Sequence, residues 1–84
     1  MSEARDVVAY LARALVDDGD AVRVTEAEQN GVIVLELFVA PDDLGKVIGR
    51  QGRTAAALRT LAAAAGDRTG RKVMLEIREP GRRD

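Results

Sequence analysis

The stretch GKVIGRQG, residues 45–52, decides how the chain is expected to fold. Its second half, Gly49-Arg50-Gln51-Gly52, has a glycine at each end of a short connection between two helical patterns. Glycine permits backbone angles that side chains forbid, and it lets the main chain come very close to another backbone. A helix begins directly after the second glycine, and the free amide groups at a helix start favour an anion such as a phosphate. With Lys46, Arg50 and Arg53 on or beside the same turn, the stretch predicts a phosphate-binding site.

Other glycine motifs do not fit this turn. The lysine precedes the glycines and no Gly-Lys-Ser/Thr ending follows, so it is not a P-loop, and the spacing is not the dinucleotide fingerprint. Nucleotide hydrolysis is therefore unsupported. A bare Gly-x-x-Gly is usually only a tight turn between two helices. Here the apolar pair Val47-Ile48, the basic Lys46 and the alanine-rich helix that follows make the signal far more specific.

Two helices are predicted around the turn. The first opens at Pro41-Asp42-Asp43, because proline suits the first helical position and aspartates suit the positive end of the helix dipole, and it stops at Gly49. The second starts near Gly52 or Arg53 and ends at Gly66, followed by a loop over residues 67–70. Their apolar faces are formed by Leu44, Val47 and Ile48 and by Ala55, Leu58, Leu61, Ala62 and Ala65. Leu44, Leu58 and Leu61 are assigned to the core, whereas Ile48 fits core packing and a ligand groove equally well.

Three strands are predicted from the remaining patterns. The Asn30-Gly31 turn signal joins residues 22–28 and 32–40 into a hairpin, and residues 72–78 alternate as a third strand. The core-facing side chains are expected to be Ile33, Leu35, Leu37 and Val39 in the second strand and Val73, Leu75 and Ile77 in the third. The opposite set in the second strand contains Glu36, so Val34 and Phe38 are expected to be partly exposed on an open sheet face.

A further helix is predicted at the N-terminus, over residues 3 to about 17, with Ser2 as its cap. Its buried stripe is expected to comprise Ala4, Val7, Val8, Leu11, Ala14 and Leu15. The element order is then α-β-β-α-α-β, which predicts a two-layer α+β domain over residues 1–79 whose three-stranded sheet is covered on one face by three helices. Residues 80–84 are expected to form a disordered polar tail.

The charges are distributed unevenly along the chain, although the net charge is only −1. Residues 1–43 hold three basic and ten acidic groups, whereas residues 44–72 hold seven basic groups and Asp67 as their single acid. Such an asymmetry indicates a local site for a polyanion on an otherwise acidic body. A solvated surface with clustering by chance is the alternative, and the position of the glycine turn inside the basic block argues against it.

Composition excludes several classes of function. The chain has no cysteine and no histidine, which removes thiolate nucleophiles, the usual zinc ligands and the side chain best suited to proton transfer at neutral pH. We therefore expect no enzyme, no catalytic residues, no metal and no cofactor. No apolar run approaches the roughly 18 residues of a membrane span, so the chain is expected to be cytoplasmic.

The stretch Val47-Ile48-Gly49-Arg50-Gln51-Gly52 resembles the GXXG signature of KH domains, in which that loop clamps a nucleic-acid backbone. The order of elements resembles the bacterial type II KH arrangement. Size and layout, from about residue 3 to residue 79, resemble the small single-KH proteins of bacteria known as the KhpA type. The acidic overall charge departs from a typical RNA binder and places high affinity in question.

The resemblance implies an RNA groove. Its predicted RNA-binding residues are Lys46, Val47, Ile48, Gly49, Arg50, Gln51, Gly52 and Arg53, and its opposite wall is expected near Ile33 and Leu35 of the second strand. About four unpaired nucleotides would lie with phosphates on the loop and bases over an apolar floor. With one tyrosine, one phenylalanine and no tryptophan, stacking on aromatic side chains is not the expected mode of binding.

The sequence thus predicts a cytoplasmic single-stranded RNA-binding protein, an RNA chaperone or post-transcriptional regulator. An adaptor with the same fold, whose Val34, Phe38 and Met74 or alanine helix docks a partner protein, is the alternative; a small enzyme acting on a phosphorylated metabolite ranks last. Because Ala56, Ala57, Ala63 and Ala64 are expected on the surface, a homodimer or a heterodimer with another KH-domain protein is a further expectation.

Overall fold

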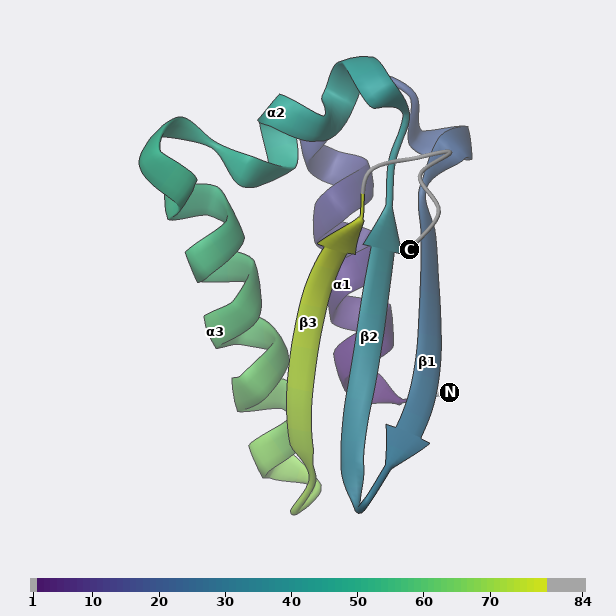
Figure 1. Cartoon of the computed structure of the whole chain (residues 1–84), viewed down its shortest axis with the longest axis vertical. Coiled ribbons are helices and arrows are strands. Elements are labelled where there is room, and N and C mark those ends of the chain that lie inside the picture. The colour runs from purple at the N-terminus through teal and green to yellow at the C-terminus, as the bar shows by residue number, and fades with distance from the viewer. Residues whose placement is uncertain (1, 79–84) are drawn as a thin grey trace.

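The computed structural model describes residues 2–78, so the predicted tail at 80–84 lies outside the described residues. The helices and strands are α1 (Glu3–Leu15), β1 (Arg23–Gln29), β2 (Val32–Phe38), α2 (Leu44–Ile48), α3 (Arg53–Arg68) and β3 (Lys72–Arg78). The sheet order is β1-β2-β3, with β1 antiparallel and β3 parallel to the central strand. Helices α1 and α3 cover one face of the sheet, and α2 lies across one end of it (Figure 1). The predicted α+β order is confirmed.

The hairpin and the central strand form as their patterns predict. Asn30 and Gly31 both take positive φ angles, 53° and 80°, and Gln29 pairs directly with Val32 across this two-residue turn. Positive φ at both central positions matches the turn to the twist of the flanking strands. The core-facing set predicted for the second strand is buried: Ile33, Leu35 and Leu37 in β2, and Val39 directly after it. Val34 and Phe38 on the other face are half-buried.

The buried face of α1 is turned from the predicted one. Ala9 and Ala12 are buried together with Ala4 and Val8, whereas Ala14 and Leu15 are exposed. The prediction for Ala14 and Leu15 was wrong because α1 packs against α3 as well as against the sheet. Two neighbouring elements require a face that is wide and made of small side chains, and alanines allow the two helices to approach closely.

Helix α3 runs past its predicted end. It continues to Arg68, and Gly66 is buried inside it. A Cβ at Gly66 would lie 2.6 Å from the carbonyl oxygen of Arg71 and would overlap the Val73 side chain, so this glycine serves close packing of the helix on β3 and does not stop the helix. Leu61, assigned to the core from the sequence, is 47% exposed and lies on the outer side of α3.

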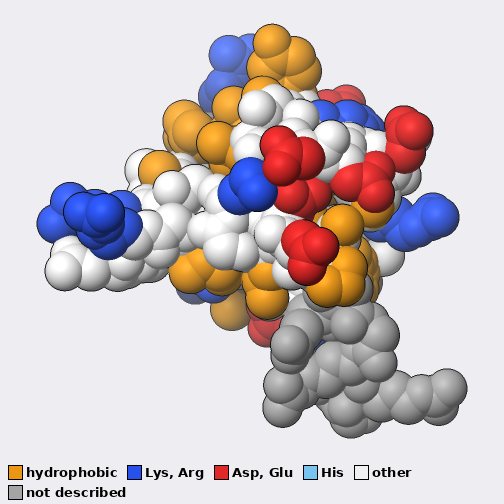
Figure 2. Space-filling model, turned by 90° about the horizontal axis from the view of Figure 1, so that it is seen from above, with side chains coloured by type: hydrophobic (Ala, Val, Ile, Leu, Met, Phe, Trp, Pro, Cys, Tyr) orange, Lys and Arg blue, Asp and Glu red, His pale blue; other side chains and the backbone are white. Residues whose placement is uncertain are grey.

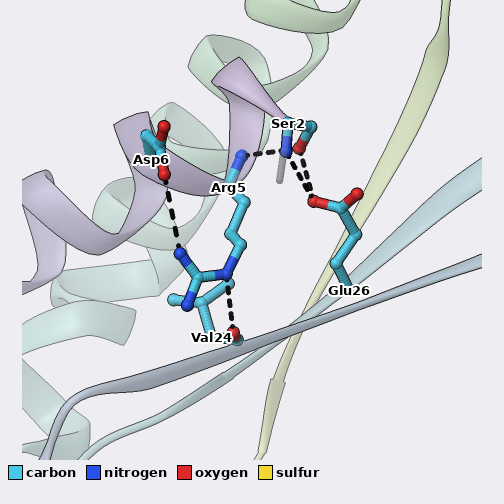
Figure 3. A network of polar contacts seen from close by, with 5 residues as sticks. All are labelled: Ser2, Arg5, Asp6, Val24 and Glu26. Atoms are coloured by element: carbon cyan, nitrogen blue, oxygen red, sulfur yellow. Dashed lines mark hydrogen bonds and ion pairs between the residues drawn. The ribbon is translucent and has the colours of Figure 1, made fainter.

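The start of α1 is attached to β1 by a polar network (Figure 3). The Ser2 hydroxyl oxygen accepts a hydrogen bond from the backbone N–H of Arg5 at 3.0 Å, which confirms the predicted cap. Both the backbone N–H and the hydroxyl of Ser2 donate to Glu26, and the Ser2 hydroxyl is the leading cause of a lowered Glu26 pKa. Arg5 Nε donates to the carbonyl oxygen of Val24 at 3.1 Å. This network lies at the end of α1 remote from α2.

Candidate nucleic-acid interface

The glycine turn projects from the fold where α2 leads into α3 (Figure 1). Helix α2 ends at Gly49, which has φ 77° and ψ 173°, and a short 3₁₀ turn over Arg50–Gly52 continues directly into α3. Three of the four turn residues have positive φ, since Gln51 (57°) and Gly52 (73°) join Gly49. The positive φ of Gln51 could not be foreseen, because the sequence places glycine only at the two ends of the turn.

The two glycines of the turn have different surroundings. A Cβ at Gly49 would lie 2.7 Å from Thr54 Cβ and would overlap the Thr54 hydroxyl, so the turn can fold back on the start of α3 only with glycine there. A Cβ at Gly52 would meet no atom within 4 Å. Both positions restrict side chains through positive φ. Only Gly52, however, leaves open space in front of its backbone where a ligand could approach.

Val47 and Ile48 have separate roles on α2. Val47 is fully buried in the main core cluster, so its side chain fixes the helix and does not face a ligand. Ile48 is half-buried and lies outside that cluster. Of the two uses that the sequence left open for Ile48, lining of a groove agrees better with this position.

The cations of the turn are exposed and lack acidic partners. Among the residues that the structure describes, Arg50 forms no ion pair, and Arg53 forms only a hydrogen bond from Nη2 to Gln51 Oε1 at 3.0 Å. Seen from above, Lys and Arg side chains gather on the projecting end, and acidic side chains gather over the other side of the same surface (Figure 2). The projecting turn is therefore a positively charged point on an acidic protein.

Lys46, in contrast, is already paired. Its Nζ lies 3.2 Å from Asp17 Oδ2 and 3.4 Å from Asp43 Oδ1, and these carboxylates, Asp17 first, raise the pKa of Lys46. The Asp43 carboxylate also accepts hydrogen bonds from the backbone N–H groups of Asp18 (3.0 Å) and Asp17 (3.2 Å). The bond from Asp18 is the leading cause of a lowered Asp43 pKa, against the effect of burial. The sequence analysis placed Asp43 at a helix start but did not pair it with Lys46, although a spacing of three residues on a helix is a signal for such a pair.

The basic block of residues 44–72 does not form one surface. Arg68 Nε lies 3.3 Å from Glu3 Oε1, and Arg71 Nη2 lies 2.6 Å from Glu28 Oε2. Both pairs stand at the far end of α3, about 20 Å from the turn at 1.5 Å per helical residue. The charge that the sequence concentrates in one segment is thus spread along the fold. Arg50 and Arg53 lie at the turn, Lys46 is paired, and the other four cations, Arg59, Arg68, Arg71 and Lys72, lie along α3 and at or just before the start of β3.

The predicted groove wall at Ile33 and Leu35 of β2 is wrong. Both side chains lie beneath the helices, 5% and 0% exposed. The edge strand β3 lies beside α3 instead, where Arg59 Nε donates to the carbonyl oxygen of Leu75 at 3.2 Å. Pairing of β3 with β2 in parallel brings β3 to the sheet edge next to α3, a topology that the sequence pattern did not reveal.

Residues 5–77 match the family model described as KhpA/KhpB, KH domain. The chain belongs to this family. The KH domain is 53% identical over 79 residues to the RNA-binding protein KhpA of Aquifex aeolicus, an alignment that covers 94% of this chain and 100% of that protein. It is 50% identical to the KhpA of Caldanaerobacter subterraneus, with 86% and 96% covered, and 47% identical to that of Treponema pallidum, with 86% and 90% covered. These relatives are named as RNA-binding proteins and not as enzymes, in agreement with the predicted absence of enzymatic activity.

The fold has a counterpart among solved structures. A crystal structure of Aquifex aeolicus Era bound to GDP and AlF4⁻ matches 88% of this chain with a TM-score of 0.64 and 22% identity. The match spans 29% of the Era chain, so it concerns the KH-like fold alone. Within residues 2–78 no helix is long and apolar enough to cross a membrane.

Proposed function

We propose that this KH domain binds single-stranded RNA and clamps its backbone with the Gly49–Gly52 turn. The observation that carries the proposal is the turn itself, a projecting main chain with positive φ angles directly before the 16-residue helix α3. Two exposed arginines flank it, Arg50 in the turn and Arg53 at the first position of the helix. Backbone amides at a helix start and guanidinium groups both favour phosphate oxygens. The names of the relatives support RNA as the polyanion.

The nucleotides that follow the clamped phosphates would run along the side where α3 faces β3. Ile48 on α2 and Ile77 on β3 are both half-buried and would supply apolar surface, and the hydrogen bond from Arg59 to the Leu75 carbonyl joins α3 to β3. Unpaired bases can lie flat on such a surface, whereas the paired bases of a duplex cannot enter it. We therefore expect a preference for single-stranded over double-stranded RNA.

In the cell the domain would act as an RNA chaperone or post-transcriptional regulator in the cytoplasm. A single short groove binds modestly, and a second KH module in a homodimer or heterodimer would raise the effective concentration. The exposed alanines of α3, Ala56, Ala57 and Ala64, with the half-exposed Leu61, offer a smooth surface for such pairing.

The adaptor remains the second candidate because of the open sheet face. Met74 is 50% exposed there, next to the half-buried Val34 with which it pairs between β2 and β3. Under this hypothesis a partner protein would cover the open sheet face, and RNA binding would be weak or absent.

Titration of single-stranded RNA at several salt concentrations tests the proposal. Binding through Arg50 and Arg53 corresponds to a log–log slope of about −1.4, and participation of Lys46 would make it about −2, at about −0.7 per phosphate neutralised. Replacing Arg50 and Gln51 together with aspartate should abolish most of the affinity and leave the melting temperature unchanged, since both side chains are exposed. A slope near zero, or full affinity of the double variant, would favour the adaptor.

A further inference from the structure

Asp43 is a buried carboxylate that connects two helices. Its residue is 2% exposed, and it stands at the end of the 3₁₀ turn that precedes α2. Its carboxylate accepts hydrogen bonds from the backbone N–H groups of Asp17 and Asp18, which follow the end of α1. Buried carboxylates remain charged only when they are hydrogen-bonded or paired. Asp43 therefore joins the exit of α1 to the entry of α2.

Lys46 completes this connection from one turn further along. Its ammonium lies between the carboxylates of Asp43 and Asp17, at 3.4 Å and 3.2 Å. The next residue, Val47, is the side chain with which α2 enters the core. Helix α2 is thus held on one side by Val47 and on the other by the clamp of Asp43, Lys46 and the main chain at residues 17–18.

The glycine turn depends on this attachment because α2 is not a stable helix without its contacts to the rest of the fold. A helix of five residues is far too short to be stable in isolation. Its last carbonyls lead straight into the turn: the N–H of Gly49 donates to the carbonyl oxygen of Gly45 at 2.8 Å, and the N–H of Gly52 donates to that of Gly49 at 3.2 Å. A shift of α2 would therefore move the first half of the turn relative to α3.

We infer that Asp43 and Lys46 are positioning residues for the Gly49–Gly52 turn, and that Lys46 holds α2 on the end of α1 instead of contacting RNA phosphate. The inference rests on the proposed RNA-binding function of the turn. A turn that is loosened must be ordered again when RNA binds, and this ordering weakens the complex. Loss of the clamp should act through the preorganisation of the turn and leave the number of neutralised phosphates unchanged.

The test compares RNA affinity and its salt dependence in four variants. Lys46→Gln removes the clamp cation, and Lys72→Gln makes the same charge change on the exposed start of β3. Asp43→Asn weakens the clamp from its buried side, and Asp42→Asn makes the same charge change on the exposed neighbour. Titrations are run well below each melting temperature, so that only folded protein is compared, and hydrogen exchange at the Asp17 and Asp18 amides reports on the clamp.

Lys46→Gln is expected to bind single-stranded RNA roughly three- to tenfold more weakly than Lys72→Gln, through the cost of ordering the turn, with an unchanged salt slope. Asp43→Asn should show the same loss relative to Asp42→Asn and faster exchange at both amides. If it fails to fold, Lys46→Gln decides alone, because Lys46 is exposed. Two results would overturn the inference: a salt slope less steep by about 0.7 in Lys46→Gln, which marks a phosphate contact, or unchanged affinity in Lys46→Gln.

Arg50→Gln in the same series separates this inference from the function on which it rests. In a true RNA clamp this variant loses affinity and its slope becomes less steep by about 0.7. If Arg50→Gln binds like the wild type, the turn is not the RNA site, whatever the Lys46 and Asp43 variants do.

Discussion

Both ends of α3 carry glycines and arginines, but among the described residues the arginines are unpaired at the start of the helix and paired with acidic side chains at its end. At its start, Arg50 and Arg53 have no acidic partner within residues 2–78, whereas at its end Arg68 and Arg71 are paired with Glu3 and Glu28. The far end uses its cations to hold the helix and the following loop to α1 and β1. The near end leaves its cations to solvent or ligand. A basic residue of the sequence is available to RNA only where no acidic side chain lies close to it in the folded protein.

The largest effects are expected from substitutions of the glycines at the two ends of α3. Gly49 and Gly66 both sit where a Cβ would overlap neighbouring atoms, and Gly49 has positive φ in addition. We expect Gly49→Ala to lower the free energy of unfolding by about 3 kcal/mol and Gly66→Ala by about 2 kcal/mol, through backbone strain and overpacking. Urea unfolding measures both. Of the two, only Gly49→Ala should also weaken RNA binding by folded protein.

Gly52→Ala is the matched control for backbone strain. Its φ of 73° makes a side chain unfavourable, but its Cβ would enter open space. The expected loss of stability is only about 1 kcal/mol. If Gly52→Ala destabilises as much as Gly49→Ala, the contact with Thr54 does not explain why glycine is needed at the start of the turn.

Charge reversal at the two ends should separate RNA binding from stability. The double variants Arg50→Glu/Arg53→Glu and Arg68→Glu/Arg71→Glu carry the same net charge. The first should bind single-stranded RNA on the order of a hundredfold more weakly, or about 2.7 kcal/mol, at an unchanged melting temperature. The second should keep most of its affinity, because its charges lie more than a Debye length of about 10 Å from the turn at 0.1 M salt.

The far-end variant should instead lose stability. It places new carboxylates beside Glu3 and Glu28. The loss of the exposed Arg68 pair costs about 1 kcal/mol or less, and the loss of the half-buried Arg71 pair costs more, in addition to the new repulsion. Fluorescence anisotropy with labelled RNA and thermal melts measure the two effects. Equal loss of RNA affinity in both double variants would mean that the whole basic block binds RNA, as the charge count alone suggested.

The fold could be predicted from the sequence where a feature depends only on residues close by in the chain. The Asn30-Gly31 turn and the alternating face of β2 depend on neighbours one to four residues away, and these predictions were confirmed. The exposure of Leu61 and Leu15 could not be foreseen, because it depends on how α1 and α3 turn against one another.

At the site the same limit applies. The glycine turn is visible in the sequence, but Asp17, the second partner of Lys46, and Glu28, the partner of Arg71, lie 29 and 43 residues away along the chain. Charge patterning indicated a basic segment and could not indicate which of its members were free. The groove wall was likewise misplaced, because the parallel pairing of β3 with β2, which places β3 beside α3, joins residues far apart in the sequence.

Replacing one arginine by alanine at each end of α3 should give a smaller difference in RNA affinity than the double charge reversals. Arg53→Ala should weaken RNA binding by about three- to fivefold and make the salt slope less steep by about 0.7. We expect little loss of stability, since the side chain is exposed and, within residues 2–78, its one hydrogen bond goes to Gln51. Arg68→Ala should change neither the RNA affinity nor the slope. Should Arg53→Ala instead lower the melting temperature by many degrees, the turn would owe its shape to that side chain.

The smallest expected difference is in the loss of folding stability at low pH. The pKa values of Asp43 near the turn and of Glu26 at the Ser2 network are both lowered in the folded state. A lowered pKa means that the stabilisation is fully present above the unfolded pKa of about 4 and is lost as the pH falls through the folded value.

Thermal melts between pH 6 and about pH 2 should therefore show a steepening loss of stability below roughly pH 4, and Asp43→Asn should flatten that limb. The groups that face Asp43 are Lys46, which stays charged throughout, and the main chain of Asp17 and Asp18, whose N–H groups donate to the Asp43 carboxylate. Glu26→Gln should flatten the limb less, because Glu26 is exposed and its bonds to Ser2 compete with water. If both variants lose stability with falling pH as the wild type does, neither carboxylate contributes to the acid sensitivity, which must then come from other groups. If Glu26→Gln has the larger effect, the fold is held against acid at the Ser2 network, and the Asp43 clamp contributes less to overall stability than to the placement of the turn.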